Sequence, residues 1–294
     1  MPPTNWSPWK PLPLRLTSAV LAETLDGGQS FRWQGENHGC WLGIWSDCVV
    51  RLATSEAGFL QWSAPPSLVD PVRLRLADYL RLETEIAEQV DMLPWRSDAH
   101  LAKCLAAFPG LRILRQPFGE SLLCFLCSAT KQIVQIKQMT ALLANRLGRE
   151  IVPGFNSLPT WSELANVSEL TLRSCLLGFR ARHIHETATF LAEHPDWLAE
   201  TEALPYAEAK ERLCQLPGVG EKIADCALLF GGGRLEAFPV DVWILRTMER
   251  RYGLTGWKPA QVAQFGRAHF GPLAGLAQQY LFAYERHAAK GFVI

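Results

Sequence analysis

The spacing of hydrophobic positions along the chain changes near residue 71. Before that point, short apolar and aromatic runs at 27–33, 40–45 and 48–52 are separated by glycine and asparagine turns. Short strands joined by tight turns are typical of an antiparallel sheet. Residues 1–14 contain five prolines and little periodicity, so we expect an irregular lead-in there.

From residue 71 onward, hydrophobic residues recur every three or four positions, which is the spacing of an amphipathic helix. The predicted helices cover 74–82, 86–90, 101–108, 118–143, 162–165 and 167–176. Asp98 is placed to cap the third of them. Polar residues interrupt the longest helix at 130–135, where we expect either a ligand-facing or a surface-facing turn.

These two patterns together predict an α+β protein. We expect an N-terminal antiparallel sheet domain with flanking helices, residues 1–98, packed on a mainly helical domain, residues 99–294. Tryptophan usage supports the sheet, because seven of the eleven tryptophans lie at or before Trp95.

Residues 207–230 predict two helices joined by a tight hairpin. Apolar residues recur at helical spacing on both sides of the turn: Ala209, Leu213 and Leu216 before it, and Ile223, Ala227 and Phe230 after it. The turn itself is Pro217-Gly218-Val219-Gly220, whose glycines allow a left-handed backbone. Unpaired amide groups at the start of the second helix favour an anion, and a phosphate suits that place.

A lysine and a carboxylate follow the hairpin turn. Lys222 lies in the first turn of the second helix, where it can contact a phosphate or, as a neutral amine, attack the anomeric carbon of a nucleotide to form a Schiff base. Such a reaction needs a group that stabilises positive charge on the sugar and helps to move protons. Asp241 can be that group, or it can be a helix N-cap. Spacing alone favours neither role over the other.

The formal net charge is zero, which alone argues against a nucleic-acid partner. Residues 1–102 hold 8 basic and 12 acidic side chains, a net of −4, whereas residues 103–294 hold 21 and 17, a net of +4. A solvated surface explains this asymmetry as well as a DNA-binding face does. It places any polyanion site in the second part of the chain.

Eight cysteines are scattered without the regular spacing of a disulfide framework, which indicates reduced thiols in a cytosolic protein. Cys124 and Cys127 have the spacing of a redox or metal pair, but their apolar surroundings favour core packing. No cysteine follows Cys226, so we expect no iron–sulfur cluster. Without a signal sequence or an apolar run of about 18 residues, we expect a protein that is neither secreted nor membrane-spanning.

Six separated motifs resemble the helix–hairpin–helix DNA glycosylases, and within them the 8-oxoguanine DNA glycosylase/lyase family. The central one is Leu216-Pro-Gly-Val-Gly-x-Lys222-x-Ala-Asp-Cys226 with Pro239-Val-Asp241-Val. The others are Gly28-Gln-Ser-Phe-Arg-Trp33, Leu114-Arg-Gln116, Cys127-Ser128, Leu177-Gly-x-Arg-Ala-Arg182, and Ala277-Gln278 with Leu281-Phe282. A lone hairpin motif would be far less specific than this combination.

The resemblance implies a bifunctional enzyme of base excision repair. Lys222 would be the Schiff-base nucleophile and Asp241 the essential carboxylate. The enzyme would excise 8-oxoguanine from duplex DNA and cleave 3′ of the site by β-elimination.

The resemblance also implies how the lesion is read. The flipped base would lie between Phe282 and Cys226, and Gln278 would read its Watson–Crick edge. The Gly28 carbonyl would accept the N7 hydrogen, which guanine lacks, so guanine would leave that acceptor facing a lone pair.

Further residues would contact the DNA. Phe179 and Arg180 would occupy the wedge and the space near the orphaned base. Gly218, Val219 and Gly220 would hold phosphate, with a possible monovalent cation on the hairpin carbonyls.

The chain departs from the family pattern at three places. Thr130-Lys131-Gln132 replaces a run of asparagines, Gln135 replaces an arginine that would read the opposite cytosine, and Trp243 replaces a histidine. Lys131 and Gln135 are therefore candidate DNA contacts whose recognition of the opposite base is altered.

Two other functions remain open from the sequence. The same fold could act on another damaged purine, or the hairpin could be a non-catalytic DNA-binding unit, which would have no need for Asp241 or the Gly28 motif. In each case we expect a monomer that binds double-stranded DNA in the cytoplasm or nucleoid, or in the nucleus of a eukaryote, without a membrane partner.

Overall fold

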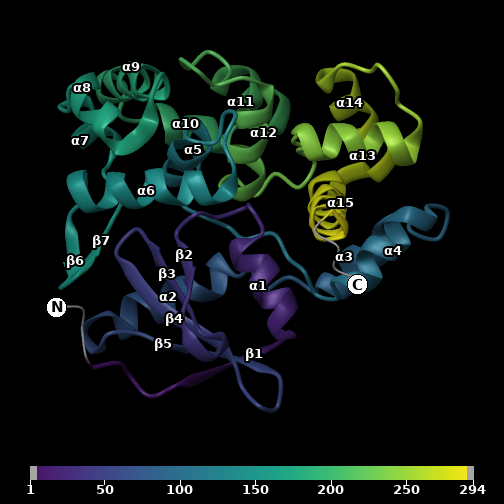
Figure 1. Cartoon of the computed structure of the whole chain (residues 1–294), viewed down its shortest axis with the longest axis horizontal. Helices are drawn as coiled ribbons and strands as arrows, with labels where there is room; N and C mark the ends of the chain where they lie inside the picture. Colours follow the sequence, from purple (N-terminus) through teal and green to yellow (C-terminus); the bar gives the residue numbers. More distant parts are fainter. Residues whose placement is uncertain (1–4, 290–294) are drawn as a thin grey trace.

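Five antiparallel strands form one layer of the protein, and helices form the other (Figure 1). The computed structural model describes residues 5–289. The strand order is β1-β5-β4-β3-β2, with every neighbouring pair antiparallel. The strands are β1 (Lys10–Arg15), β2 (Trp33–Gly35), β3 (Trp41–Trp45), β4 (Cys48–Thr54) and β5 (Phe59–Ser63). The predicted antiparallel sheet and α+β class are confirmed.

The expected irregular lead-in is confirmed for residues 5–9 but is wrong from residue 10 onward. Residues 10–15 form the edge strand β1, which pairs Lys10 with Trp62 and Pro11 with Gln61. Proline cannot donate a ladder hydrogen bond, but an edge strand leaves one side without a partner and tolerates it. Helix α1 (Ser18–Asp26) was also missed; its N-cap Thr17 accepts a hydrogen bond from the Val20 amide.

The other regular elements are helices, apart from the small β6–β7 hairpin (Glu150–Val152, Phe155–Asn156). They are α2 (Val69–Tyr79), α3 (Ile86–Met92), α4 (Ala99–Ala107), α5 (Phe118–Leu126), α6 (Ile133–Leu147), α7 (Trp161–Ala165), α8 (Glu169–Leu172), α9 (Arg180–Glu193), α10 (Trp197–Ala203), α11 (Tyr206–Leu213), α12 (Glu221–Phe230), α13 (Val242–Tyr252), α14 (Pro259–Phe270) and α15 (Ala274–Ala288). Asp98 caps α4 as predicted, because its side chain accepts from the Leu101 amide at 2.8 Å.

The predicted long helix over 118–143 is wrong, because the chain leaves the helix between α5 and α6. Thr130 has a left-handed backbone (φ 55°), which ends helical hydrogen bonding. Gln132 then caps α6 through a reciprocal pair of hydrogen bonds with Gln135. The polar residues that interrupted the apolar pattern therefore form a turn, which we call the 127–132 turn.

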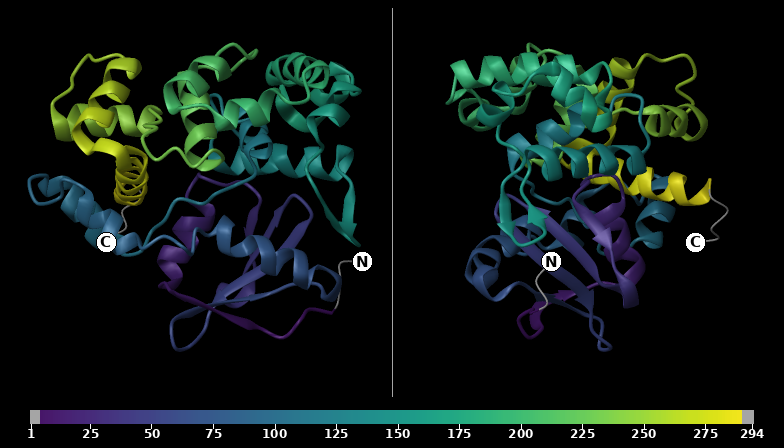
Figure 2. Two further views of the ribbon diagram at one scale, coloured as in Figure 1. Left: turned by 180° about the vertical axis from the view of Figure 1, so that it is seen from behind. Right: turned by 60° about the vertical axis from the view of Figure 1, so that its left-hand side comes forward.

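The two layers share one hydrophobic core, since buried residues of the sheet, of α1 and of the later helices form a single cluster. The last helix, α15, packs against α4 and beside α13 and α14 (Figures 1 and 2). It also returns to α1, where Arg286 pairs with Glu23. The boundary expected between residues 98 and 99 stays a prediction.

Cys124 and Cys127 lie in this core, with 4% and 0% of their surfaces exposed. Burial raises the pKa of Cys127 to about 12, so the thiol stays protonated at neutral pH. Within residues 5–289, no cluster of three or more histidine, cysteine or acidic side chains is placed to hold a metal ion. In the same range, none of the helices combines the length and the apolar character needed to cross a bilayer.

Candidate active site

The hairpin forms between α11 and α12 as the apolar spacing predicts. The six apolar residues that define its two faces are each at most 7% exposed. Gly218 has φ 77°, and a Cβ there would lie 2.5 Å from the Nδ1 atom of His183 on α9. Only glycine therefore fits this close approach of the hairpin to α9.

The start of α12 is open to a ligand. Gly220 is the N-cap, and a Cβ built on it would have no heavy atom within 4 Å. The first amide groups of a helix have no intrahelical acceptor, so they can bind a phosphate there. Val219 is only 5% exposed, which restricts it to a backbone contact. Glu221 is also exposed in this turn and pairs with Lys210 at 3.3 Å.

The amine of Lys222 lies among side chains of α5, α12 and the 127–132 turn. Its Nζ atom donates to the Ser128 hydroxyl at 3.0 Å and lies 5.3 Å from the centre of the Phe125 ring. It also interacts with the thiol of Cys226, one helical turn further along α12. Phe125, Ser128 and Cys226 are buried, so they hold the amine in a largely apolar setting.

Asp241 is a helix cap and a neighbour of Lys222 at the same time. Its Oδ1 atom accepts from the Ile244 amide at 2.8 Å, at the start of α13. Burial raises the pKa of its carboxyl group, while the Ile244 hydrogen bond and the charge of Lys222 act in the opposite direction. The sequence alone did not separate a capping role from a catalytic role for Asp241. In the structure Asp241 caps α13 and also lies near Lys222, so capping does not exclude catalysis.

Cys226 faces this pair as a neutral thiol. Burial raises its pKa to about 12 although the nearby Lys222 charge lowers it. A protonated thiol is a small apolar surface with a weak donor, which suits one wall of a base pocket.

Three distant segments meet at Gly28. A Cβ built on this glycine (φ 95°) would lie 3.0 Å from Ile133 Cδ1 and 3.3 Å from Phe282 Cε1. Ile133 opens α6 directly after the turn that carries Ser128, and Phe282 lies on α15. The Gly28 backbone and the Phe282 ring are therefore close neighbours, as the proposed base pocket requires.

Gln278 lies one helical turn before Phe282 on α15 and so shares its face. The residue is 5% exposed, and its Oε1 atom has no hydrogen-bond partner among the described residues. Buried polar atoms without a partner are rare in folded proteins. An amide in this state is available to the edge of a bound base.

The turn that contains Gly28 is fastened by the fully buried side chain of Gln29. Its Oε1 atom accepts from the Leu114 amide at 2.8 Å, and its Nε2 atom donates to the carbonyls of Thr24 and Arg112. Both amide ends are therefore satisfied by backbone groups, which fixes the direction of the neighbouring Gly28 carbonyl.

The loop before α9 presents two large apolar side chains to solvent. Phe179 is 53% exposed, as the sequence predicts, and Leu176 is 52% exposed. Leu176 also has a left-handed backbone (φ 62°), which is strained for a leucine. Leu176 could not be singled out from the sequence, because leucine is ordinary in a helical pattern.

The structure places Arg180 differently from the expected contact with an orphaned base. The residue is 3% exposed, and its guanidinium donates to the Leu177 carbonyl at 3.1 Å, to the Thr130 hydroxyl at 3.0 Å and to the Ala129 carbonyl. Because backbone groups of two loops occupy it, Arg180 joins the Leu176–Phe179 loop to the 127–132 turn instead of facing solvent.

Neither candidate reader of the opposite base touches the Lys222 cluster. Lys131 and Gln135 are exposed, and the Gln135 side chain accepts from the Gln132 amide at 3.2 Å as part of the α6 cap. Their contacts with DNA stay predictions. Besides Leu176, sequence reasoning missed Ile133, and it named Ser128 only as part of a motif, without its contact to Lys222. Ser128 and Ile133 flank the same polar interruption that the sequence marked as a ligand-facing or surface-facing turn.

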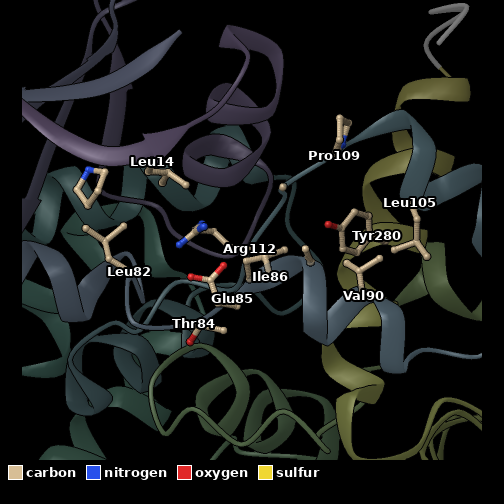
Figure 3. Close-up of a pocket in the computed structure, with 13 residues that line it drawn as sticks. Leu14, Leu82, Thr84, Glu85, Ile86, Val90, Leu105, Pro109, Arg112 and Tyr280 are labelled. Atoms are coloured by element: carbon tan, nitrogen blue, oxygen red, sulfur yellow. The ribbon is translucent and has the colours of Figure 1, made fainter.

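A cavity of about 390 Å³ lies away from these residues, between the sheet layer, α3, α4 and α15 (Figure 3). Tyr280 lines it from α15 and donates to the Leu111 carbonyl at 2.9 Å. None of the candidate site residues lines this cavity. The cavity therefore lies on the side of α15 that is hydrogen-bonded to the linker before α5.

Two family models match consecutive parts of the chain. Residues 11–122 match the 8-oxoguanine DNA glycosylase N-terminal domain, which includes Gly28. Residues 123–269 match the HhH-GPD superfamily of base excision DNA repair proteins, which includes Ser128, Lys222 and Asp241.

Relatives of known name agree with these models. The N-glycosylase/DNA lyase OGG1 of Arabidopsis thaliana is 31% identical over 98% of this chain and 83% of its own length. The N-glycosylase/DNA lyase of Saccharomyces cerevisiae is 28% identical over 84% of this chain and 72% of its own length. The 8-oxoguanine glycosylase/lyase of Clostridium acetobutylicum, solved with double-stranded DNA containing cytosine opposite 8-oxoG, superposes with a TM-score of 0.85 at 29% identity and covers 92% of both chains.

Proposed function

The chain belongs to the 8-oxoguanine DNA glycosylase family of helix–hairpin–helix repair proteins, and from this premise we propose which of its residues perform the reaction. It is a bifunctional N-glycosylase/DNA lyase of base excision repair that acts on 8-oxoguanine and binds duplex DNA. The observation that carries our assignment is a continuous set of contacts. It runs from Lys222 to Ser128, along the 127–132 turn to Ile133, and from there to Gly28 and Phe282.

In the first step, Lys222 gives up a proton to solvent, and its amine attacks C1′ of the flipped nucleotide. The C1′–N9 bond breaks, and its electron pair leaves with the base, which takes up a proton. Positive charge develops on the sugar as this bond breaks, and the Asp241 carboxylate stabilises that charge. The Ser128 hydroxyl orients the amine through the hydrogen bond at 3.0 Å.

In the second step, the sugar ring opens as the C1′–O4′ bond breaks, which leaves Lys222 joined to C1′ as a protonated Schiff base. A proton is then lost from C2′, and the electron pair of that C–H bond expels the 3′ phosphate. The DNA strand is thereby cleaved by β-elimination. Phe125 and Cys226 limit the access of water to the covalent intermediate, because both are buried against the amine.

The lesion is read in the space between Phe282 and Cys226. The Phe282 ring stacks on the base, and the Gly28 carbonyl accepts the N7 hydrogen that only the oxidised base carries. Gln278 meets the Watson–Crick edge with an amide oxygen that has no partner among residues 5–289. Guanine would leave the Gly28 acceptor without a donor, which costs about 1–3 kcal/mol when the acceptor is buried.

Replacing Gly28 with alanine is expected to block this pocket without touching Lys222. The new methyl group would lie 3.0 Å from Ile133 Cδ1 and 3.3 Å from Phe282 Cε1, on a backbone (φ 95°) that alanine rarely adopts. Release of 8-oxoguanine in single-turnover assays should fall by about 100-fold, because a misplacement of about 1 Å at a reacting centre has that cost.

Cleavage at a preformed abasic site is the control for the Gly28→Ala variant. No base occupies the pocket there, so cleavage should match that of the native protein. Equal losses on both substrates would contradict a role of Gly28 in base recognition, and loss of 8-oxoguanine release from the native protein would contradict the proposed function itself.

Leu176 and Phe179 form the apolar wedge that enters the duplex when the base is extruded. Exposure and backbone strain both destabilise Leu176 in the free protein, and the fold gains no core contact from its half-exposed side chain. Replacing Leu176 with glycine should raise the free energy of unfolding by about 1 kcal/mol, because glycine adopts φ 62° without strain.

The same Leu176→Gly variant should excise 8-oxoguanine more slowly from a matched duplex, yet at the native rate from a mismatched bubble in which the base is already unstacked. Thermal melting and excision assays measure the two effects. A variant that is more stable and equally active on the matched duplex would show that Leu176 has no part in extrusion.

The reaction needs no cofactor, since both reacting groups are side chains, and we propose that none is bound in the pocket. A monovalent cation on the hairpin carbonyls also stays a proposal. The carbonyls of Leu216 and Pro217 already accept from the Val219 amide and the Thr187 hydroxyl, and each keeps a second lone pair. We further propose that the protein acts as a monomer, in the cytoplasm or nucleoid, or in the nucleus of a eukaryote.

A further inference from the structure

A buried carboxylate lies beneath the turn that carries Gly28. Glu23 is on α1 and is 3% exposed. Its Oε2 atom accepts from Arg286 Nη2 at 2.5 Å and from His287 Nε2 at 2.8 Å, both on α15. Glu23 therefore joins the N-terminal layer to the helix that carries Phe282 and Gln278.

The same carboxylate lies directly beside the turn, and its Oε1 atom has no hydrogen-bond partner among the described residues. A Cβ built on Gly27 would lie 2.4 Å from Glu23 Oε1 and 2.1 Å from the Glu23 carbonyl oxygen. Only glycine at position 27 allows the chain to pass this close to Glu23. Because Gly27 precedes Gly28, the Glu23 side chain borders the segment that carries the Gly28 carbonyl.

Arg286 completes a closed ring of contacts. Its guanidinium carbon lies 5.8 Å from the centre of the Phe282 ring, one helical turn earlier on α15. Phe282 in turn lies next to Gly28. The ring therefore runs from Glu23 to Arg286, to Phe282, to Gly28, and through Gly27 back to Glu23.

We propose that Glu23 is a positioning residue that sets the distance between the Gly28 carbonyl and the Phe282 ring. It does so by holding α15 against the 27–28 turn through Arg286 and His287. The proposal rests on the proposed function, in which these two groups contact the same flipped base. Glu23 itself touches neither the base nor the sugar.

Other contacts hold α15 at places away from the 27–28 turn. Tyr280 donates to the Leu111 carbonyl at 2.9 Å on the side shown in Figure 3. Glu285 pairs with Arg251 of α13 at 3.1 Å. These contacts hold the helix in the fold, whereas the Glu23 pair holds it close to the 27–28 turn, where Phe282 also meets Gly28.

The test compares two reactions of one protein. In Glu23→Gln, the ion pair is lost while the shape of the side chain remains. The single-turnover rate constant for release of 8-oxoguanine should fall by about 10- to 100-fold, since small displacements at a reacting centre have effects of this size. Cleavage and borohydride trapping at a preformed abasic site should stay at the native rate, because no base fills the pocket.

Two further variants complete the test. Glu23→Asp keeps the charge and should recover part of the lost base release. Arg251→Gln removes one contact of Glu285 on the same helix, while that with His100 remains, and should leave the ratio of base release to abasic-site cleavage unchanged. If Glu23→Gln does not fold, as thermal melting would show, Arg286→Lys tests the same pair with the positive charge retained.

The outcomes distinguish a failure of the proposed role of Glu23 from a failure of the proposed function. Equal losses of base release and abasic-site cleavage in Glu23→Gln would reduce Glu23 to a stabilising residue and overturn the proposal, and so would native base release. Absence of 8-oxoguanine release from the native protein would overturn the proposed function instead.

Discussion

Replacing Lys222 with glutamine should abolish base release, strand cleavage and covalent trapping by borohydride. Glutamine can still donate to the Ser128 hydroxyl, so the neighbourhood should stay intact. It has no nucleophilic amine, so neither the C1′ adduct nor the Schiff base can form. We expect the single-turnover rate of 8-oxoguanine release to fall by at least about 1,000-fold, since loss of a catalytic nucleophile has effects of this size or larger.

Lys210 provides a matched control in the other helix of the hairpin. Its amine lies 3.0 Å from Asp225 Oδ2, so Lys210→Gln removes a second partly buried lysine of the same motif. This variant should melt at a lower temperature because Asp225 loses its partner, but it should still be trapped by borohydride. An undiminished covalent adduct with Lys222→Gln would contradict the assignment of the nucleophile.

Replacing Asp241 with asparagine should separate its two roles. Asparagine caps helices about as well as aspartate, so the hydrogen bond from the Ile244 amide should survive and the melting temperature should change little. The charge that stabilises the developing cation is lost, so base release should fall by about 100- to 10,000-fold. Asp241→Ala should lose the same activity and also about 1 kcal/mol of stability with the cap.

The pH dependence gives a second readout for Asp241. Burial raises the pKa of its carboxyl group, and the reaction needs the ionised form. Base release should therefore decline as the pH falls through a range above that of an ordinary aspartate, and this acid limb should be absent from Asp241→Asn. Native rates in the asparagine variant would show that Asp241 is a helix cap and nothing more.

The sequence predicted the hairpin and its chemistry because they are local. The helical spacing around residues 209–230, the glycines of the turn and Lys222 lie within one short segment. The carboxylate of Asp241 follows soon after, at a helix start that its own side chain caps. Such features depend on neighbours in the chain, which a sequence displays directly.

The sequence failed where long-range contacts decide the structure. Nothing near Arg180 shows that its guanidinium is taken up by the carbonyls of residues 129 and 177. The partner of Lys222 is Ser128, which lies 94 positions earlier in the chain. The contact between Gly28, Ile133 and Phe282 joins three segments that only the folded protein brings together.

The remaining errors lie where the tertiary setting overrides local preferences. The predicted helix over 118–143 is broken at Thr130, whose left-handed backbone no propensity rule anticipates. The strand β1 forms despite two prolines because it lies at the edge of the sheet. Both departures follow from the tertiary setting, and the first of them creates the turn that holds Ser128 against the Lys222 amine.

The most direct measurement is to identify the amino acid that carries the covalent adduct. The native protein is incubated with duplex DNA containing 8-oxoguanine opposite cytosine, the intermediate is reduced with borohydride, and the digested adduct is mapped by mass spectrometry. The account predicts a single modified peptide, with the reduced sugar on the Nζ atom of Lys222. An adduct on any other amine, or base release without an adduct, would contradict it.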